Sequence, residues 1–454
     1  MTRRIAMGFV VFMFVLSSII VNKIHAAFDC ELHLTPSSSQ DEKDYCQSIL
    51  TQMEAELAKL LDLQKQQQKQ TGTLTGDVNY LTSQINALKT KIKARTLAIA
   101  QLKVNITEKV NTINSLSSKI RREHETLAQL LRNTNEFDNE NIIHLILSDE
   151  SVSNFYSDLE SYASIKQAVK DSVDIIKGVK TQTEVAKQDL EKKQNAETDA
   201  KVELENAQKK VAVSEAEKKQ LLSISKQTEA AYQKLATEKK AQADRIRAAL
   251  FPLRDAEAIP FGTALMYAEN AAKKTGVRPA FVLAILQQES NMGIDVGSCV
   301  ITNLSTGETS GVTYGTIFSN GIHPTRDLPL LQSIVEGLGR NPLTTRVSCP
   351  FGGGYGGAMG PTQFIPSTWN GIKGRVASAL GKAMPDPWNP EDAIMASSIY
   401  LAELGAGVGG YTAERTSALK YYAGGNWNQA KNAFYGNQVM ARVSAIQANI
   451  DLLQ

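Results

Sequence analysis

Proline is absent from residues 37–251, and that stretch holds only three glycines, Gly72, Gly76 and Gly178. It also lacks tryptophan and is rich in Lys, Glu, Gln and Ala. Because proline interrupts helices and glycine weakens them, this composition predicts long helices and excludes a globular mixed fold there. The composition changes at Pro252, after which most of the glycines and all the tryptophans occur. Two structural units are therefore expected, with a boundary near this residue.

The sequence also lacks the features that bind a nucleic acid, a metal ion or a cofactor. Its 49 basic and 47 acidic residues give a formal net charge of +2, so the basic surface typical of nucleic-acid-binding proteins is missing. The five histidines are scattered singly, without the spacing of metal ligands, and no glycine-rich phosphate-binding motif is present. We therefore expect no nucleic-acid partner, no metal site and no cofactor.

The first residues have the order of a secretory signal peptide. Two arginines are followed by an apolar run, residues 5–21, and then by the small residues Ala26 and Ala27. We predict a signal peptide at residues 1–27. The alternative is an uncleaved membrane tether, because the run nearly reaches the ~20 apolar residues that span a bilayer. In both cases the protein is expected to be exported, to the periplasm or the extracellular cell wall.

The four cysteines fall into two local groups, Cys30 with Cys46 and Cys299 with Cys349. An even number of cysteines in an exported chain favours disulfides, although four cysteines allow three pairings. Because one group lies in each half of the chain, we predict disulfides within the groups. The alternative is that the thiols are reduced and buried.

A coiled-coil pattern begins at Leu81. Apolar residues recur from there to Ile106 at alternating steps of four and three, and Arg95 stands at the one missing position. That 3.5-residue period is typical of a coiled-coil seam. It predicts one arm of a long helical structure within residues 28–250.

A second, weaker seam runs from Leu204 to Leu235, with Ser214 among the residues that interrupt it. The segment between the two seams is less regular and more apolar. Two arms around a different segment predict an antiparallel hairpin, with short helices at its tip, about residues 137–165.

The tip has a recognisable sequence. The runs Ile143–Ser148 (IHLILS) and Phe155–Leu159 (FYSDL) resemble the coiled coils of bacterial peptidoglycan-hydrolase regulators of the EnvC and PcsB type, over roughly residues 45–250. This resemblance implies that the tip binds an FtsE–FtsX-like membrane complex. The alternative is a passive spacer or a dimerising rod.

The unit after Pro252 is expected to consist of helices joined by glycine-rich loops. Pro279 suits the first turn of a helix, whose apolar positions through Leu286 place Glu289 on the buried face. Burial should raise the pKa of a carboxyl there, so that it keeps a proton near neutral pH, as a general acid requires. By itself, however, a glutamate at a helix end is usually a solvated charge.

Four motifs follow one another in an order similar to that of lytic transglycosylases in the lysozyme-like superfamily. Residues Gln288–Ser290 (QES) resemble the catalytic Glu-Ser step, and Gly357–Trp369 (GAMGPTQFIPSTW) resembles the central motif. Asp386–Ile394 (DPWNPEDAI) is similar to the next segment of the MltB-like branch, and Tyr421–Gly425 (YYAGG) to the Tyr-Asn-Ala-Gly motif. The resemblance implies a helical lysozyme-like domain at residues 252–454, and a mainly α protein.

The resemblance also implies a reaction and a set of site residues. Glu289 would protonate the oxygen between MurNAc and GlcNAc of peptidoglycan and then accept the proton of the muramoyl C6 hydroxyl, closing a 1,6-anhydro ring. Tyr421 would hydrogen-bond near this carboxyl, and Gln363 and Met359 would line the groove. Ser290 would contact the substrate or cap the helix.

Two departures from the family stand out. The insert at about residues 295–356 is longer than expected and contains two of the cysteines, so it could be a lid, a partner site or a surface insertion. Tyr422 replaces the asparagine of the family motif and is either a sugar-stacking residue or part of the core. For Trp369, Trp388 and Tyr400, packing in the core is preferred.

The leading prediction is an exported lytic transglycosylase that its coiled coil regulates or positions during cell-wall remodelling or division. One alternative is a muramidase that uses water and releases reducing ends, with Asp295, Glu308 or Asp327 as its second carboxylate. The other is a non-catalytic scaffold that binds peptidoglycan and activates other hydrolases.

Overall fold

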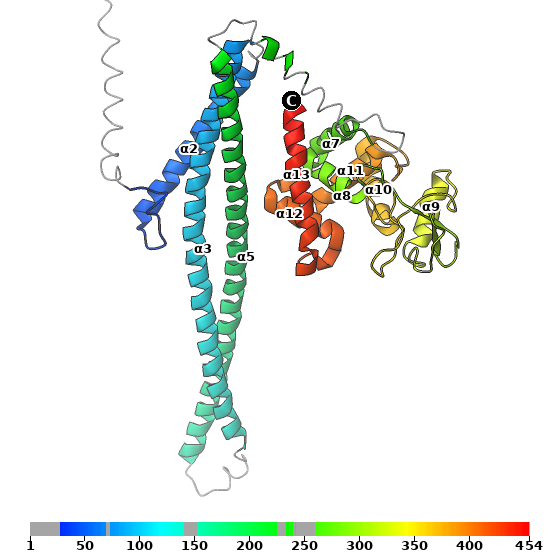
Figure 1. The fold of residues 1–454 in the computed structure, drawn as a ribbon. Helices are drawn as coiled ribbons and strands as arrows, with labels where there is room; N and C mark the ends of the chain where they lie inside the picture. The colour runs from blue at the N-terminus through cyan, green and yellow to red at the C-terminus, as the bar shows by residue number, and fades with distance from the viewer. Residues whose placement is uncertain are drawn as a thin grey trace, which may run out of the picture. The chain divides into compact units, whose positions relative to one another are not determined.

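The structure is a computed structural model, mainly helical (Figure 1). It describes residues 28–69, 73–139, 152–224, 233–235, 237–238, 241 and 259–453. The chain divides into two compact units, Met1–Gln227 and Thr228–Gln454. The predicted signal peptide and the predicted boundary at Pro252 lie outside the described residues. Within the described part, no helix is both long and apolar enough to cross a membrane.

The first unit contains the predicted hairpin. Helices α3 (Leu74–Asn139) and α5 (Val152–Ile224) run antiparallel along each other (Figure 1). The pairs that join them move forward along α3 and backward along α5: Gln84 with Ser214 (2.8 Å), Arg95 with Glu203 (2.6 Å) and Lys109 with Asp189 (2.8 Å). The antiparallel hairpin expected from the two seams is therefore confirmed.

The predicted tip is in large part a continuation of the arms. Helix α3 extends to Asn139, and α5 begins at Val152. Residues 152–165, expected as short helices, are thus the first turns of one long helix. Residues 140–151, with Leu145 and Leu147, lie outside the described residues.

Small side chains form the contact face of α5. With one exception, Thr183, the buried residues of the described part of α5 recur at whole multiples of seven; they are Ser172, Val179, Ala186, Ala200, Ala207, Ser214 and Leu221. A heptad spacing keeps these residues on the side that faces α3. Ser214, which interrupts the apolar seam in the sequence, is a contact residue whose hydroxyl donates to the side-chain oxygen of Gln84 at 2.8 Å. The α5 seam is weak in hydrophobicity because small residues occupy it.

A third helix, α2 (Gln40–Gln68), covers a second face of α3. Leu50 of α2 packs with Ala94 and Leu97 of α3, which are buried although they lie outside the predicted seam. Helix α3 therefore has two apolar faces, one for α5 and one for α2. The sequence analysis identified only the first, because a single 3.5-residue period describes one face.

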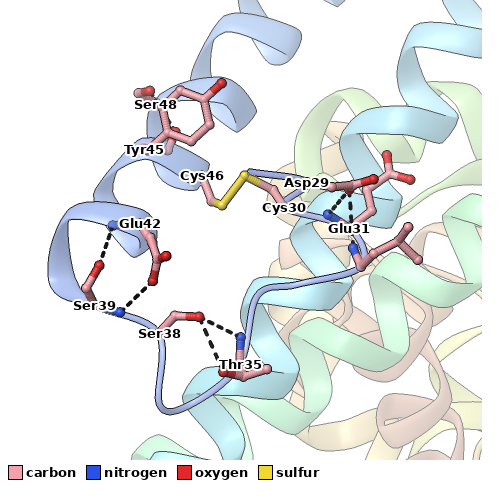
Figure 2. The surroundings of a disulfide bond; sticks show 11 residues. Asp29, Cys30, Glu31, Thr35, Ser38, Ser39, Glu42, Tyr45, Cys46 and Ser48 are labelled. Atoms are coloured by element: carbon pink, nitrogen blue, oxygen red, sulfur yellow. Dashed lines mark hydrogen bonds between the residues drawn. A yellow bond between two sulfur atoms is a disulfide. The ribbon is translucent and has the colours of Figure 1, made fainter. Parts of the chain in front are cut away.

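The start of α2 is fixed by a disulfide and by a cap (Figure 2). Cys30 bonds to Cys46, with their Cα atoms 5.6 Å apart, and both side chains are buried against α3. The Ser39 amide donates to the Glu42 carboxylate at 2.8 Å, and the Glu42 amide donates to the Ser39 hydroxyl at 3.3 Å. This reciprocal capping box satisfies amides that the first turn leaves unpaired.

Arg95, the one polar residue in the predicted seam, joins all three helices. Its Nε donates to Glu203 of α5 at 2.6 Å, and its Nη1 lies 3.4 Å from a carboxylate oxygen of Glu54 in α2. Burial opposes ionisation of Glu203, but the contacts with Arg95 and Lys91 outweigh it and lower the pKa of this carboxyl. Arg95 is thus a cross-link at the missing apolar position.

We expect Arg95→Ala to loosen α2. Partly exposed charge pairs contribute up to ~1 kcal/mol, so amide hydrogens of residues 40–68 should exchange about fivefold faster in hydrogen–deuterium exchange. Lys209→Ala, which removes an exposed pair within α5, is the control. Unchanged α2 exchange in Arg95→Ala would contradict this role.

The second unit is built around one apolar helix. Helix α8 (Pro279–Ser290) is buried continuously from Ala280 to Leu286, as expected for a central helix. Around its core pack α7 (Phe261–Thr275), α11 (Pro390–Glu403), α12 (Tyr411–Ala423) and α13 (Ala433–Leu453). Helix α10 (Pro366–Leu380) packs against α11, with Trp369 fully buried in a second core. The preference for Trp369 as a core residue is confirmed.

The insert folds as a small sheet and a helix. Strands β1 (Cys299–Ile301), β2 (Thr309–Gly311) and β3 (Ile317–Phe318) form an antiparallel sheet, and α9 (Leu328–Gly337) follows. The sheet was not predicted, because strands of two or three residues are too short to show an alternating pattern. Ile301, Ile322, Leu328 and Leu331 of the insert are buried in the same core as Trp369. The insert is therefore an integral part of the unit.

The second predicted disulfide is also formed. Cys299 of β1 bonds to Cys349, with their Cα atoms 5.1 Å apart. The backbones of Cys299 and Val347 exchange hydrogen bonds of 2.9 Å, which places the end of the insert beside its first strand. Both disulfides pair as the sequence analysis expected.

Candidate active site

Glu289 lies in the last turn of α8, where the chain leaves the core. The next residue, Ser290, is 1% exposed, and its hydroxyl donates to the Leu286 carbonyl (3.2 Å) and accepts from the Gly293 amide (2.9 Å). Asn291 and Met292 follow with positive φ angles of 48° and 61°, which end the helix. Of the two roles expected for Ser290, the structure gives it that of closing the helix end.

The carboxyl of Glu289 is held by a residue that the sequence analysis missed. The hydroxyl of Tyr435, in the first turn of α13, hydrogen-bonds to Oε1 of Glu289. Next to it, Arg442 of α13 donates to the side-chain oxygen of Gln288 at 2.8 Å. Two adjacent residues of α8 are thus bound to the same helix. Tyr435 belongs to none of the quoted motifs, so no motif in the sequence pointed to it.

Burial dominates the acid–base properties of this pair. Desolvation raises the pKa of Glu289 to about 7, and the Tyr435 hydrogen bond only partly opposes the rise. Burial, followed by the charge of Glu289, raises the pKa of Tyr435 well above its usual value, so this hydroxyl stays a donor. Glu289 is partly exposed as a residue, although burial of its carboxyl is what raises the pKa. A carboxyl in this state is suited to giving and taking a proton near neutral pH.

Tyr421 binds the backbone of the central motif. Its hydroxyl donates to the Thr362 carbonyl at 2.7 Å. Burial, followed by the charge of Glu289, raises the pKa of Tyr421, so the ring lies within electrostatic reach of the carboxyl. Its edge packs near Phe364 and Tyr400, with ring centroids 5.6 Å from each. Tyr421 therefore positions the central motif, and Tyr435 binds the acid.

The central motif folds into a tight turn. The Met359 amide donates to the Phe364 carbonyl at 2.9 Å, and the Gln363 amide donates to the Gly360 carbonyl at 3.2 Å. Gly360 has φ +63°, and a Cβ there would lie 1.9 Å from the Pro387 carbonyl oxygen, so only glycine fits. The turn therefore packs directly against the segment that precedes α11.

The two side chains expected to line the groove differ in accessibility. Gln363 is partly exposed and has φ +54°, a conformation that non-glycine residues rarely adopt and that costs of order 1 kcal/mol or more. Its side-chain nitrogen Nε2 also donates to the Gly360 carbonyl, at 2.7 Å. Met359 is 0% exposed and packs in the second core. Its side chain therefore supports the turn from beneath and does not line an accessible surface.

The carboxylates considered as a second catalytic group have other surroundings. Asp327 is buried and bound by Arg326 and by the Ser367 amide (3.0 Å), and these contacts lower its pKa although burial opposes them. Glu308 accepts from the Thr302 hydroxyl at 2.8 Å. Among the residues that the structure describes, burial and Tyr435 are the causes that shift the pKa of Glu289, and no carboxylate is one of them. No cluster of His, Cys, Asp and Glu suited to a metal occurs in that part of the chain.

Comparison with known families agrees with this geometry. The profile of a family described as the transglycosylase SLT domain matches residues 178–444, which is more than half of the 454 residues. The chain belongs to the transglycosylase SLT domain family. Its substrate is accordingly peptidoglycan, and its catalytic unit has the helical lysozyme-like fold.

The family match begins in α5 at Gly178, well before the predicted domain boundary at Pro252. No match was found among curated proteins or among solved structures. The resemblance of residues 45–250 to EnvC-type and PcsB-type regulators stays a prediction.

Tyr435→Phe should lower the rate and shift the pH profile. The hydroxyl stabilises the ionised form of Glu289, so its loss should raise the Glu289 pKa above about 7 and move the alkaline limb of kcat/KM to higher pH. The rate at neutral pH should fall about tenfold, because the carboxyl loses its orienting partner. Turnover of purified peptidoglycan across a pH series measures both effects. Tyr421→Phe is the control: it should lower the rate less and leave the limb in place.

Proposed function

We propose that this transglycosylase is exported and cleaves the MurNAc–GlcNAc bond of peptidoglycan with formation of 1,6-anhydro ends. The observation that carries the proposal is the state of Glu289: one carboxyl, on a residue that is partly exposed, with a pKa raised by burial to about 7 and a hydrogen bond from Tyr435. In the described part of the chain, no second carboxylate shifts that pKa. Most glycosidases flank the cleaved bond with two carboxylates. A single carboxyl that can alternate between acid and base favours an intramolecular route.

The proposed reaction uses that one group twice. Protonated Glu289 gives its proton to the glycosidic oxygen, and the bond from this oxygen to C1 of MurNAc breaks, which releases GlcNAc with a free 4-hydroxyl. The C6 hydroxyl of the same MurNAc then bonds to C1, and its proton passes to the Glu289 carboxylate. Atoms and protons balance without water, and the carboxyl returns to its starting state. Between the two steps, the Tyr435 hydroxyl stabilises the ionised carboxylate.

The support for the remaining site residues differs from one to the next. Gln363 is the best candidate for a substrate contact, because it is partly exposed and its unusual backbone conformation is fixed by the Gly360 turn. Strained residues of this kind concentrate at functional sites. Burial of Met359 and Ser290 favours supporting roles for both.

Glu289→Gln should abolish turnover while leaving the melting temperature nearly unchanged, because the amide keeps the shape of the side chain but has no proton to donate. Purified sacculi should be digested with the wild type and the variant, and the products analysed by mass spectrometry. Anhydro ends from the wild type alone are the expected result. Reducing ends would indicate a muramidase, and no product from either protein would indicate a scaffold.

We further propose that the helical unit positions the enzyme through a membrane partner. Both disulfides, Cys30–Cys46 and Cys299–Cys349, support export, since disulfides persist in oxidising compartments. The 66-residue helix α3 is about 100 Å long at 1.5 Å per residue, so the tip can bind a partner far from the start of the hairpin. The EnvC-like resemblance of the tip points to an extracellular domain of the FtsX type, during cell-wall remodelling or division.

The double substitution Phe155→Asp and Leu159→Asp, in the first turns of α5, should abolish binding to such an FtsX-type domain. Turnover of purified peptidoglycan should stay unchanged. Val185→Asp, at a 61% exposed position of the same helix, is the control and should bind normally. Binding can be measured by surface plasmon resonance on the mature chain. Normal binding by the double variant would contradict a binding role for the first turns of α5 and would favour the alternative that the hairpin is a spacer.

A further inference from the structure

Two half-exposed aromatic rings lie beside the Glu289–Tyr435 pair. Tyr422, the second-last residue of α12, is 50% exposed, and Phe434, the second residue of α13, is 47% exposed. The Tyr422 ring stacks on the Tyr435 ring, with centroids 4.6 Å apart and planes 14° apart. Phe434 meets Tyr422 edge-on, with centroids 5.6 Å apart and planes at 77°. Two contacts therefore connect the carboxyl of Glu289 to an exposed aromatic surface.

The stack covers one face of the Tyr422 ring. Tyr435, which is 3% exposed, lies against that face. Half of the Tyr422 side chain nevertheless stays exposed, and Phe434 lies at the edge of the ring. An aromatic ring held flat by a buried neighbour is a rigid binding surface that loses little conformational entropy when a ligand binds. Apolar rings next to a few polar groups are also typical of ligand-binding sites.

The chemistry of this surface fits a sugar ring. In β-1,4-linked glucosamine-type sugars the bulky substituents are equatorial, so the ring faces present axial C–H groups. Those C–H groups carry slight positive charge and are attracted to the negative face of an aromatic ring, and their apolar area is buried at the same time. The asparagine that Tyr422 replaces in the family motif has no such face.

We propose that Tyr422 is a sugar-binding residue whose outer face stacks on one of the pyranose rings next to the cleaved bond, with Phe434 bordering the same ring. The proposal rests on the proposed function, because it takes Glu289 as the group at the bond. Tyr435 then binds the acid through its hydroxyl and supports the sugar-binding ring through its face. The alternative role of Tyr422 is to shield Tyr435 from water.

The test measures binding and catalysis separately. Binding uses the full mature chain with Glu289→Gln, which should retain substrate without cleaving it, and a soluble GlcNAc–MurNAc tetrasaccharide as the probe in calorimetry. In that background, Tyr422→Ala should weaken binding about tenfold, the size expected for loss of one ring contact. Tyr422→Phe keeps the ring and should bind within about twofold of the parent. Tyr314→Ala, at a 90% exposed tyrosine of the insert, is the control and should leave the affinity unchanged.

The pH profile distinguishes stacking from shielding. With Glu289 present, Tyr422→Ala should raise KM about tenfold and leave the alkaline limb of kcat in place. Unchanged affinity together with a shifted limb would overturn the proposal, because it would mean that Tyr422 only shields Tyr435. If the wild type cleaves peptidoglycan but Tyr422→Ala binds the tetrasaccharide as tightly as its parent, the sugar-binding role of Tyr422 is refuted and the proposed function stands. If the wild type releases no product and the Glu289→Gln chain binds no tetrasaccharide, the proposed function fails as well.

Discussion

The pKa of Glu289 depends on two opposing interactions, its burial at the end of α8 and its hydrogen bond from Tyr435. Burial alone would hold the carboxyl neutral, and full exposure would leave it ionised at neutral pH. The position of Glu289 at the end of the central helix, with Tyr435 as its partner, gives a pKa of about 7. The core around α8 fixes the carbon chain of the acid, and α13 brings the hydroxyl to it. The packing of the unit thus determines the acid strength of one side chain.

The other contacts of the site fix the central motif, Gly357–Trp369. Tyr421 fixes the Thr362 carbonyl, and Gly360 allows the turn to lie directly against Pro387. Asp327 binds the Ser367 amide at the start of α10, which joins the insert to the core behind the central motif. These contacts come from segments far apart in the sequence, and each of them involves a residue of the central motif, Gly357–Trp369.

What could be predicted from the sequence was whatever a local pattern encodes. The heptad period predicted two antiparallel arms, the apolar run after Pro279 predicted the buried helix with Glu289 at its end, and the grouping of the cysteines predicted both disulfides. The rest depends on contacts between distant segments. The second face of α3 could not be assigned without α2, and the strands of the insert are too short to carry a period. The partners of Tyr421 and Tyr435 are set by how α12 and α13 pack, which no spacing within a motif reveals.

The separation of Glu289 and Tyr435 along the chain affects when their contact can form. Glu289 and Tyr435 are 146 residues apart, with the disulfide-closed insert and three helices of the core between them. During synthesis, Glu289 therefore leaves the ribosome long before its partner exists, and the acid has no tuned pKa until α13 has emerged and packed. A protease cut that releases α13 would likewise leave a chain with every family motif intact but without the Tyr435 hydroxyl beside Glu289. The contact thus forms late, in a single packing step.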